Sequence, residues 1–112
     1  MSQYLLLLHA DPAGFQRLSP DQREKAVEKY MAWTKKPFTV DSKRLAPEPG
    51  RVIRANGGQP KVTDGPYSET KEVLGGFYLI EAANYDDAVK KAMDHPHLEN
   101  GGTIEVRELY RM

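Results

Sequence analysis

The chain has 112 residues, close to the commonest size of a single domain, and we expect one domain over residues 1–112. Sixteen basic residues balance sixteen acidic ones, so no overall field attracts nucleic acid or an anionic membrane, and we expect neither as a direct partner. The lack of cysteine excludes disulfide scaffolds, thiolate metal sites and cysteine nucleophiles.

The first apolar segment is Tyr4–Leu8, which ends at the turn-forming stretch His9–Gly14. It is too short for a membrane span or a signal-peptide core, and we expect a cytoplasmic protein. A continuous apolar run of this length predicts a strand that is buried on both faces.

A helix is predicted to begin at Ser19, which caps it, with Pro20 at the first helical position and Gln22 completing a capping box. It should stop before Pro37, because proline disfavours helical geometry in the residue ahead of it. Its apolar stripe contains Ala26, Val27, Tyr30, Met31 and Trp33.

The middle of the chain predicts short strands. Lys43–Ala46 is expected to be one of them, between two proline-bearing loops. Arg51–Ala55 and Gln59–Thr63 then form a hairpin around Asn56-Gly57-Gly58, in which Asn-Gly supplies the positive φ angles of a tight turn.

The last third predicts a strand, a helix and a strand. Phe77–Ala82 is apolar on both faces, and Asn84 caps a second helix whose stripe runs from Tyr85 to Ala92. Thr103–Leu109 is the final strand.

This order predicts an α+β fold, a ferredoxin-like split βαβ sandwich with an inserted hairpin and both helices on one face of the sheet. Because Tyr4–Leu8 and Phe77–Ala82 are apolar on both faces, the opposite face also needs a cover. A second copy of the chain is the simplest cover, so we expect a sheet-to-sheet homodimer.

The stretch Asp64–Glu72, DGPYSETKE, resembles the signature of the DGPF proteins of the YCII-related family, with Tyr67 in place of phenylalanine and Ser68 in place of alanine. Lys36–Leu45 departs from the family, whose members usually carry a glycine-rich segment there. Further matching segments are Met31–Trp33, Leu74–Ile80, His95–Leu98 and Gly101–Arg107.

The resemblance implies a dimeric α+β barrel of ferredoxin-like protomers. Family activity is largely unassigned, and a histidine–aspartate pair has been proposed as an active site in the wider group. Some DGPF proteins are encoded beside, or fused to, alternative sigma factors, which implies an accessory role.

The predicted topology brings all three histidines to one rim of the sheet, together with several acids. We take His97, His9 and Asp64 as catalytic candidates, because a histidine oriented by a carboxylate suits acid–base chemistry. Ligand-binding candidates at the same rim are Tyr67, Glu69, Asp11 and His95.

Each candidate also has a structural interpretation. Asp64 in Asp-Gly-Pro is typical of a turn, His97 is a loop histidine, and His95 near a helix end is expected to favour the cationic form. The histidines with Asp11 match no standard metal motif, and Gly75-Gly76 is not a phosphate loop, so we predict no metal and no cofactor.

Two functions remain open at this point. The first is a small dimeric, enzyme-like protein that uses a His/Asp acid–base pair on a small organic ligand. The alternative is a non-catalytic accessory protein that senses a ligand or docks on a regulator such as a sigma factor.

Overall fold

The computed structural model describes residues 1–111. Its elements in chain order are β1 Ser2–Ala10, α1 Pro12–Gln16, α2 Pro20–Thr34, β2 Thr39–Arg44, β3 Arg51–Asn56, β4 Gln59–Asp64, β5 Val73–Ala82, α3 Tyr85–Ala92, the 3₁₀ helix η1 Pro96–Asn100 and β6 Thr103–Glu108. Within the described range no helix has both the length and the apolar character needed to cross a membrane.

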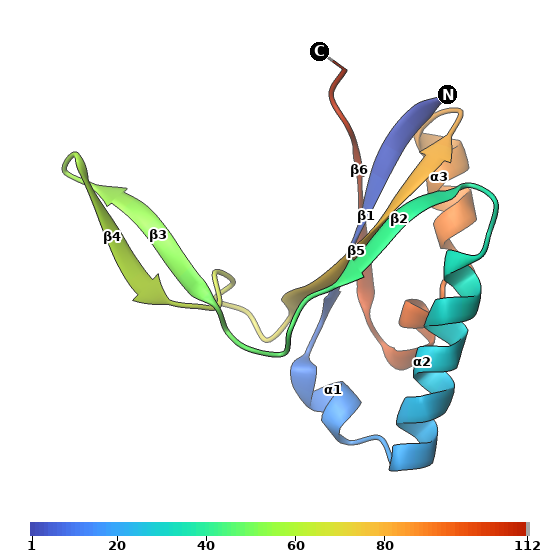
Figure 1. The fold of residues 1–112 in the computed structure, drawn as a ribbon, viewed down its shortest axis with the longest axis horizontal. Coiled ribbons are helices and arrows are strands. Elements are labelled where there is room, and N and C mark those ends of the chain that lie inside the picture. The colour runs from blue at the N-terminus through green and yellow to red at the C-terminus, as the bar shows by residue number, and fades with distance from the viewer. Residues whose placement is uncertain (112) are drawn as a thin grey trace.

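Four strands form an antiparallel sheet in the order β2–β5–β1–β6. This is the order that a split βαβ chain produces, with the first strand between the third and the last of the main sheet. Helices α2 and α3 lie on one side of this sheet, and a separate β3–β4 hairpin extends on the other side (Figure 1). We call the four-stranded sheet with its helices the body and Arg51–Asp64 the arm.

Local signals in the sequence fix both long helices. Ser19 Oγ accepts from the Gln22 amide, and the Gln22 side chain accepts from the Ser19 amide, so the predicted capping box is confirmed. Asn84 caps α3 by accepting from the Asp87 amide. Both helices therefore begin where the sequence predicts.

The core lies between the helices and one face of the sheet. Alternate strand residues point into it, as the period of a pleated strand requires, and Leu6 and Ile80 are fully buried there. The remaining core side chains are Tyr4, Leu8, Trp33, Tyr78, Ala82, Ala88 and Ala92.

The opposite face of the sheet has no cover within the described chain. Leu5 pairs with Leu79 and Leu7 with Phe77 across β1 and β5, and all four side chains are only half-buried. We call this surface the open face. Because the centre of the open face is apolar, the sequences of β1 and β5 are apolar on both faces.

Two predictions about the elements need correction, and two short helices are new. The strand expected at Lys43–Ala46 is β2, Thr39–Arg44, because its backbone pairs with β5 from Thr39 onward. The hairpin turn is formed by Gly57 and Gly58, both with positive φ, while Asn56 stays in β3. The short helices α1 and η1 were not predicted, because five residues are too few to show a helical period.

Candidate functional site

His97 ties three elements together at the end of β1. It is the second residue of η1, and its Nε2 lies 2.8 Å from the carbonyl oxygen of His9. Because a carbonyl only accepts, Nε2 carries the proton and Nδ1 is left to accept from the Tyr30 hydroxyl, 2.6 Å away. Both ring nitrogens are therefore occupied, and His97 holds the backbone of His9 against helix α2.

Two features keep the His97 ring in this position. The ring is 8% exposed, and burial lowers the pKa of His97 below its ordinary value, so the neutral form persists. A methyl group added at Gly102 would overlap the ring, so glycine is required beside it. Burial also raises the pKa of Tyr30 to about 12, which keeps the phenol protonated and able to donate to His97.

His95 lies in an aromatic cage beneath this network. Its ring packs against Trp33, Tyr78 and Tyr30 with centroid distances of 4.6, 4.7 and 5.2 Å, and it is 1% exposed. Nδ1 accepts from the His97 amide, whereas Nε2 has no hydrogen-bond partner among residues 1–111. Burial lowers the pKa of His95 to about 4, so the cationic form expected from its helix-end position is wrong.

His9 is the histidine whose side chain faces the open face. Its Nε2 lies 3.1 Å from Glu105 Oε1, and Glu105 pairs directly with Leu7 of the open face. The imidazole is 28% exposed and the carboxylate 44%. This places a histidine–carboxylate pair beside an apolar surface, where a small molecule can reach both groups.

Two further polar groups border this pair. Thr103 lies opposite His9 across β1 and β6, and its hydroxyl donates to Glu72 Oε1 at 2.9 Å. Glu72 carries the end of the DGPYSETKE stretch to the rim of the open face.

The other predicted site residues lie elsewhere. Asp64 ends β4 on the arm, is largely exposed and pairs with Arg51 at 3.2 Å, so the protomer does not bring it to either His9 or His97. Tyr67 is 75% exposed beneath the Arg54 guanidinium, and Glu69 is exposed. Asp11 caps α1 by accepting from the Ala13 amide.

Glu105 and Tyr30 were not predicted as site residues. Glu105 had a visible signal, because Thr103, Glu105 and Arg107 alternate with apolar residues along a strand predicted to neighbour β1. Tyr30 had none, since an apolar helix stripe gives no indication that its hydroxyl meets a histidine 67 residues away.

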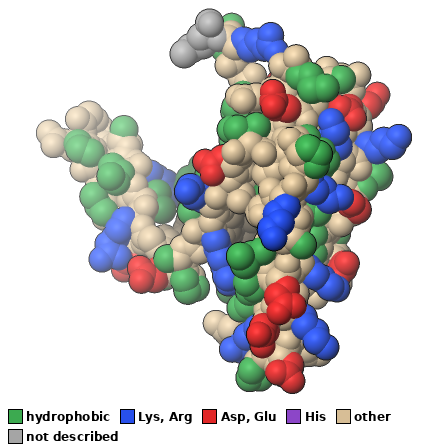
Figure 2. Space-filling view, turned by 45° about the vertical axis from the view of Figure 1, so that its right-hand side comes forward, with side chains coloured by type: hydrophobic (Ala, Val, Ile, Leu, Met, Phe, Trp, Pro, Cys, Tyr) green, Lys and Arg blue, Asp and Glu red, His purple; other side chains and the backbone are tan. Residues whose placement is uncertain are grey.

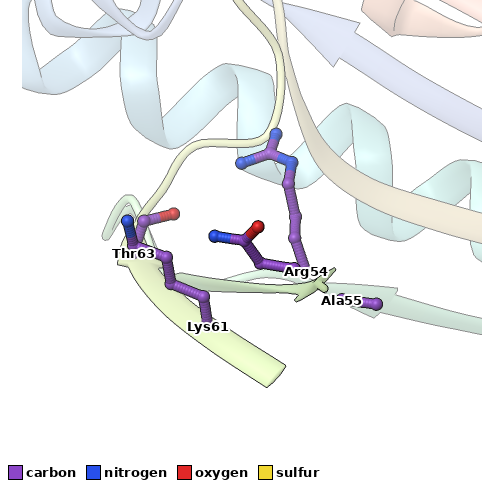
Figure 3. Close-up of a pocket in the computed structure, with 5 residues that line it drawn as sticks. Arg54, Ala55, Lys61 and Thr63 are labelled. Carbon is purple, nitrogen blue, oxygen red and sulfur yellow. The ribbon is translucent and has the colours of Figure 1, made fainter. Parts of the chain in front are cut away.

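Two surface hollows lie away from the histidines. One of about 390 Å³ is on the arm, lined by Arg54, Ala55, Asn56, Lys61 and Thr63 (Figure 3). The other, of about 490 Å³, lies between Ser2 and the segment from Glu108 to Arg111. Among the described residues no three His, Asp or Glu side chains are grouped so as to hold a metal ion.

Comparison with known proteins identifies the family. The YCII-related domain matches residues 2–112, almost the whole chain. The chain belongs to the YCII-related domain family. This YCII-related protein is also 32% identical over 114 residues to an uncharacterized protein of Rhizobium meliloti (strain 1021), covering 95% of this chain and 90% of that one.

A solved structure shares the fold of this YCII-related protein. It is the 5-chloro-2-hydroxyhydroquinone dehydrochlorinase of Burkholderia phenoliruptrix AC1100 in complex with 2,5-dihydroxybenzoquinone, with a TM-score of 0.58 over 98% of this chain and 95% of that chain. The two sequences are 14% identical, so the likeness concerns the mixed α+β fold with its antiparallel sheet.

Proposed function

We propose that this protein is a DGPF-type member of its family and a homodimer in which two open faces pack against each other as a dimeric α+β barrel. The support is the half-buried row Leu5, Leu7, Phe77 and Leu79, which nothing in the described protomer covers. Stacked sheets lie about 10 Å apart, so the His9–Glu105 pair of each protomer faces the space between them.

The mass of the protein in solution tests this dimer. Sedimentation equilibrium at micromolar concentration should give twice the protomer mass of 12.7 kDa. A negative charge introduced by Leu7→Glu should shift the protein to monomers, because the new carboxylate would be buried without a partner. A monomeric wild-type protein at that concentration would contradict the proposal.

The function that the geometry supports best is proton transfer on a small organic ligand held at the open face. The observation that carries it is the 3.1 Å contact between His9 Nε2 and Glu105 Oε1. The carboxylate orients the imidazole, while the imidazole accepts and returns a proton at the ligand. His97 acts as a positioning residue, because its Nε2 fixes the His9 backbone.

The apolar floor of the open face suits a flat, oxygenated ring. Leu7 and Phe77 pair beside His9 and offer a surface for ring packing, and the polar groups of His9, Glu105 and Thr103 border it. A fold neighbour that binds 2,5-dihydroxybenzoquinone supports this class of ligand as a first probe.

Exchange of the ring hydrogens of 2,5-dihydroxybenzoquinone for solvent deuterium, followed by NMR, tests the proposal. The protein should accelerate the exchange, and His9→Gln or Glu105→Gln should reduce the acceleration on the order of 100-fold. Glu99→Gln is the matched control, since Glu99 forms an exposed ion pair with Lys29 at 2.9 Å on the helix side. Equal rates in wild type and His9→Gln would overturn the acid–base role.

A ligand-sensing accessory protein is the second candidate. The location of a hollow on the arm, away from the histidines, favours it. Under this alternative the protein captures a regulator such as a sigma factor, and His9→Gln captures it equally well. Exchange activity that is lost in His9→Gln, with no capture of a regulator by the wild type, would favour the enzyme.

A further inference from the structure

The arm forms a sheet of its own, separate from the four-stranded sheet of the body. Within residues 1–111, β3 and β4 hydrogen-bond as a sheet only to each other. The Cα radius of gyration is 15.9 Å, whereas a compact chain of this length has about 13 Å. Figure 2 shows the arm standing apart from the body with hydrophobic side chains gathered on its surface.

A free two-stranded hairpin is marginally stable in water, so this arm needs a surface to pack on. Ile53 and Val62 pair directly across the two strands, and the adjacent pair Ala55 and Pro60 extends the same face. Ile53 is 68% exposed and Val62 58% exposed. This row of apolar side chains is the arm's packing face.

The other face of the arm carries a pair of like charges. Arg54 lies directly opposite Lys61, and two like charges in this position repel each other unless water or a counter-ion screens them. Arg54 extends toward the segment after β4, where its guanidinium lies 5.4 Å from the centre of the Tyr67 ring (Figure 3). The charged face therefore stays wet, and the Ile53–Val62 face is the one that a partner covers.

We infer that the arm is exchanged between two copies of this chain, with its Ile53–Val62 face packed on the body of the partner. The inference rests on the proposed dimer. The arm projects on the same side of the sheet as the open face, so a second copy seated there lies within its reach (Figure 1). Six-residue strands span about 20 Å, which exceeds the separation of about 10 Å between packed sheets.

Symmetry and charge favour a second copy over another partner. A two-fold axis through the paired open faces places each arm beside the other body, so both unpartnered apolar surfaces of the chain are covered together. The chain also has no net charge, so no overall repulsion opposes self-association.

Photo-cross-linking tests the exchange directly. The cysteine-free chain allows one benzophenone label at Ala55→Cys on the packing face, or at Arg54→Cys on the charged face as the matched control. In an equal mixture of ¹⁴N and ¹⁵N protein, the Ala55 label should give mixed-isotope cross-links to body peptides, several-fold more than the Arg54 label. Cross-links within one isotope only, in a sample that sediments as a dimer, would overturn the exchange and leave the dimer standing.

Dimer dissociation constants give a second, independent measure. Ile53→Glu should weaken the dimer at least 10-fold, whereas Met31→Glu, at a similarly exposed apolar residue of α2, should not. Equal dissociation constants for these two variants would overturn the exchange. A wild type that is monomeric throughout would remove the dimer and the exchange together, while the deuterium-exchange assay would still decide the role of His9.

Discussion

In both the body and the arm, successive strand residues point to opposite faces of the sheet, but only the body has helices packed on one of those faces. In β5 every second residue from Gly76 to Ala82 is buried, because helices cover that side of the sheet. In the arm the apolar pairs Ile53–Val62 and Ala55–Pro60 lie on either side of the charged pair Arg54–Lys61, yet Ile53 and Val62 remain exposed. The alternation of side chains between two faces is thus common to both regions. Packing against a second layer decides how much that alternation contributes to the free energy of unfolding.

The largest expected effect comes from truncating the same residue type in the two regions. Ile80→Ala should lower the free energy of unfolding by about 2–5 kcal/mol, because Ile80 is fully buried and a cavity remains. Ile53→Ala should change it by less than about 0.5 kcal/mol when the protein is dilute enough to be monomeric. Urea denaturation with an unchanged slope measures both, and equal losses would contradict the division into body and arm.

Acid should destabilise the body through His95. The pKa of His95 is about 4 in the folded protein against an ordinary value of 6.5. Between pH 4 and 6.5 His95 therefore binds a proton in the unfolded chain but not in the folded chain. Stability is therefore full above pH 6.5 and falls as the pH drops toward 4, by up to about 3 kcal/mol. Unfolding free energies measured at steps across this range should show the decline.

The variant His95→Asn provides the control for this decline. An asparagine carbonyl can still accept from the His97 amide at the start of η1, but it does not titrate. The variant should be less stable than wild type at pH 7 and should lose less stability on acidification. Parallel pH profiles for the two proteins would assign the decline to another group that titrates in this range, such as His97.

A smaller loss of stability is expected when the hydroxyl of Tyr30 is removed. Tyr30→Phe leaves the buried Nδ1 of His97 without its donor and should cost about 1–2 kcal/mol. Tyr110→Phe is the control, since Tyr110 is 88% exposed and its change should have no measurable effect. Thermal or urea unfolding of both variants checks this, and a neutral Tyr30→Phe would show that the Tyr30–His97 bond contributes nothing.

The sequence predicted the parts of this molecule that local signals determine. Capping residues placed both long helices, the two-faced apolar strands indicated an uncovered sheet face, and the topology brought His9, His95 and His97 to one end of the sheet. Asp64 was placed with them because a hairpin inserted in the sheet would carry it there. The sequence of the arm does not indicate that the hairpin lies outside the four-stranded sheet.

The division of roles among the histidines also depended on long-range contacts. Sequence neighbours give His95 and His97 similar surroundings, but the fold buries one in an aromatic cage and fixes the other between Tyr30 and His9. The carboxylate near His9 proved to be Glu105 of β6, a residue 96 positions away. Such pairings follow from the register of the strands, which the sequence pattern alone does not determine.

The smallest free energy is expected for local opening of the arm. Its strands have few buried contacts, so in dilute protein the amides of β3 and β4 should exchange with deuterium at an opening free energy near zero, whereas the central amides of β1 should exchange only on global unfolding. Raising the protein concentration should slow exchange in the arm if a second copy covers Ile53 and Val62, and leave β1 ordered as before. Ile53→Glu should abolish that concentration dependence, because a charge on the packing face opposes docking without changing the hairpin pairing. Arm protection that equals that of β1 at every dilution would mean that the hairpin is stable by itself, and the contrast drawn between the two regions would then be wrong.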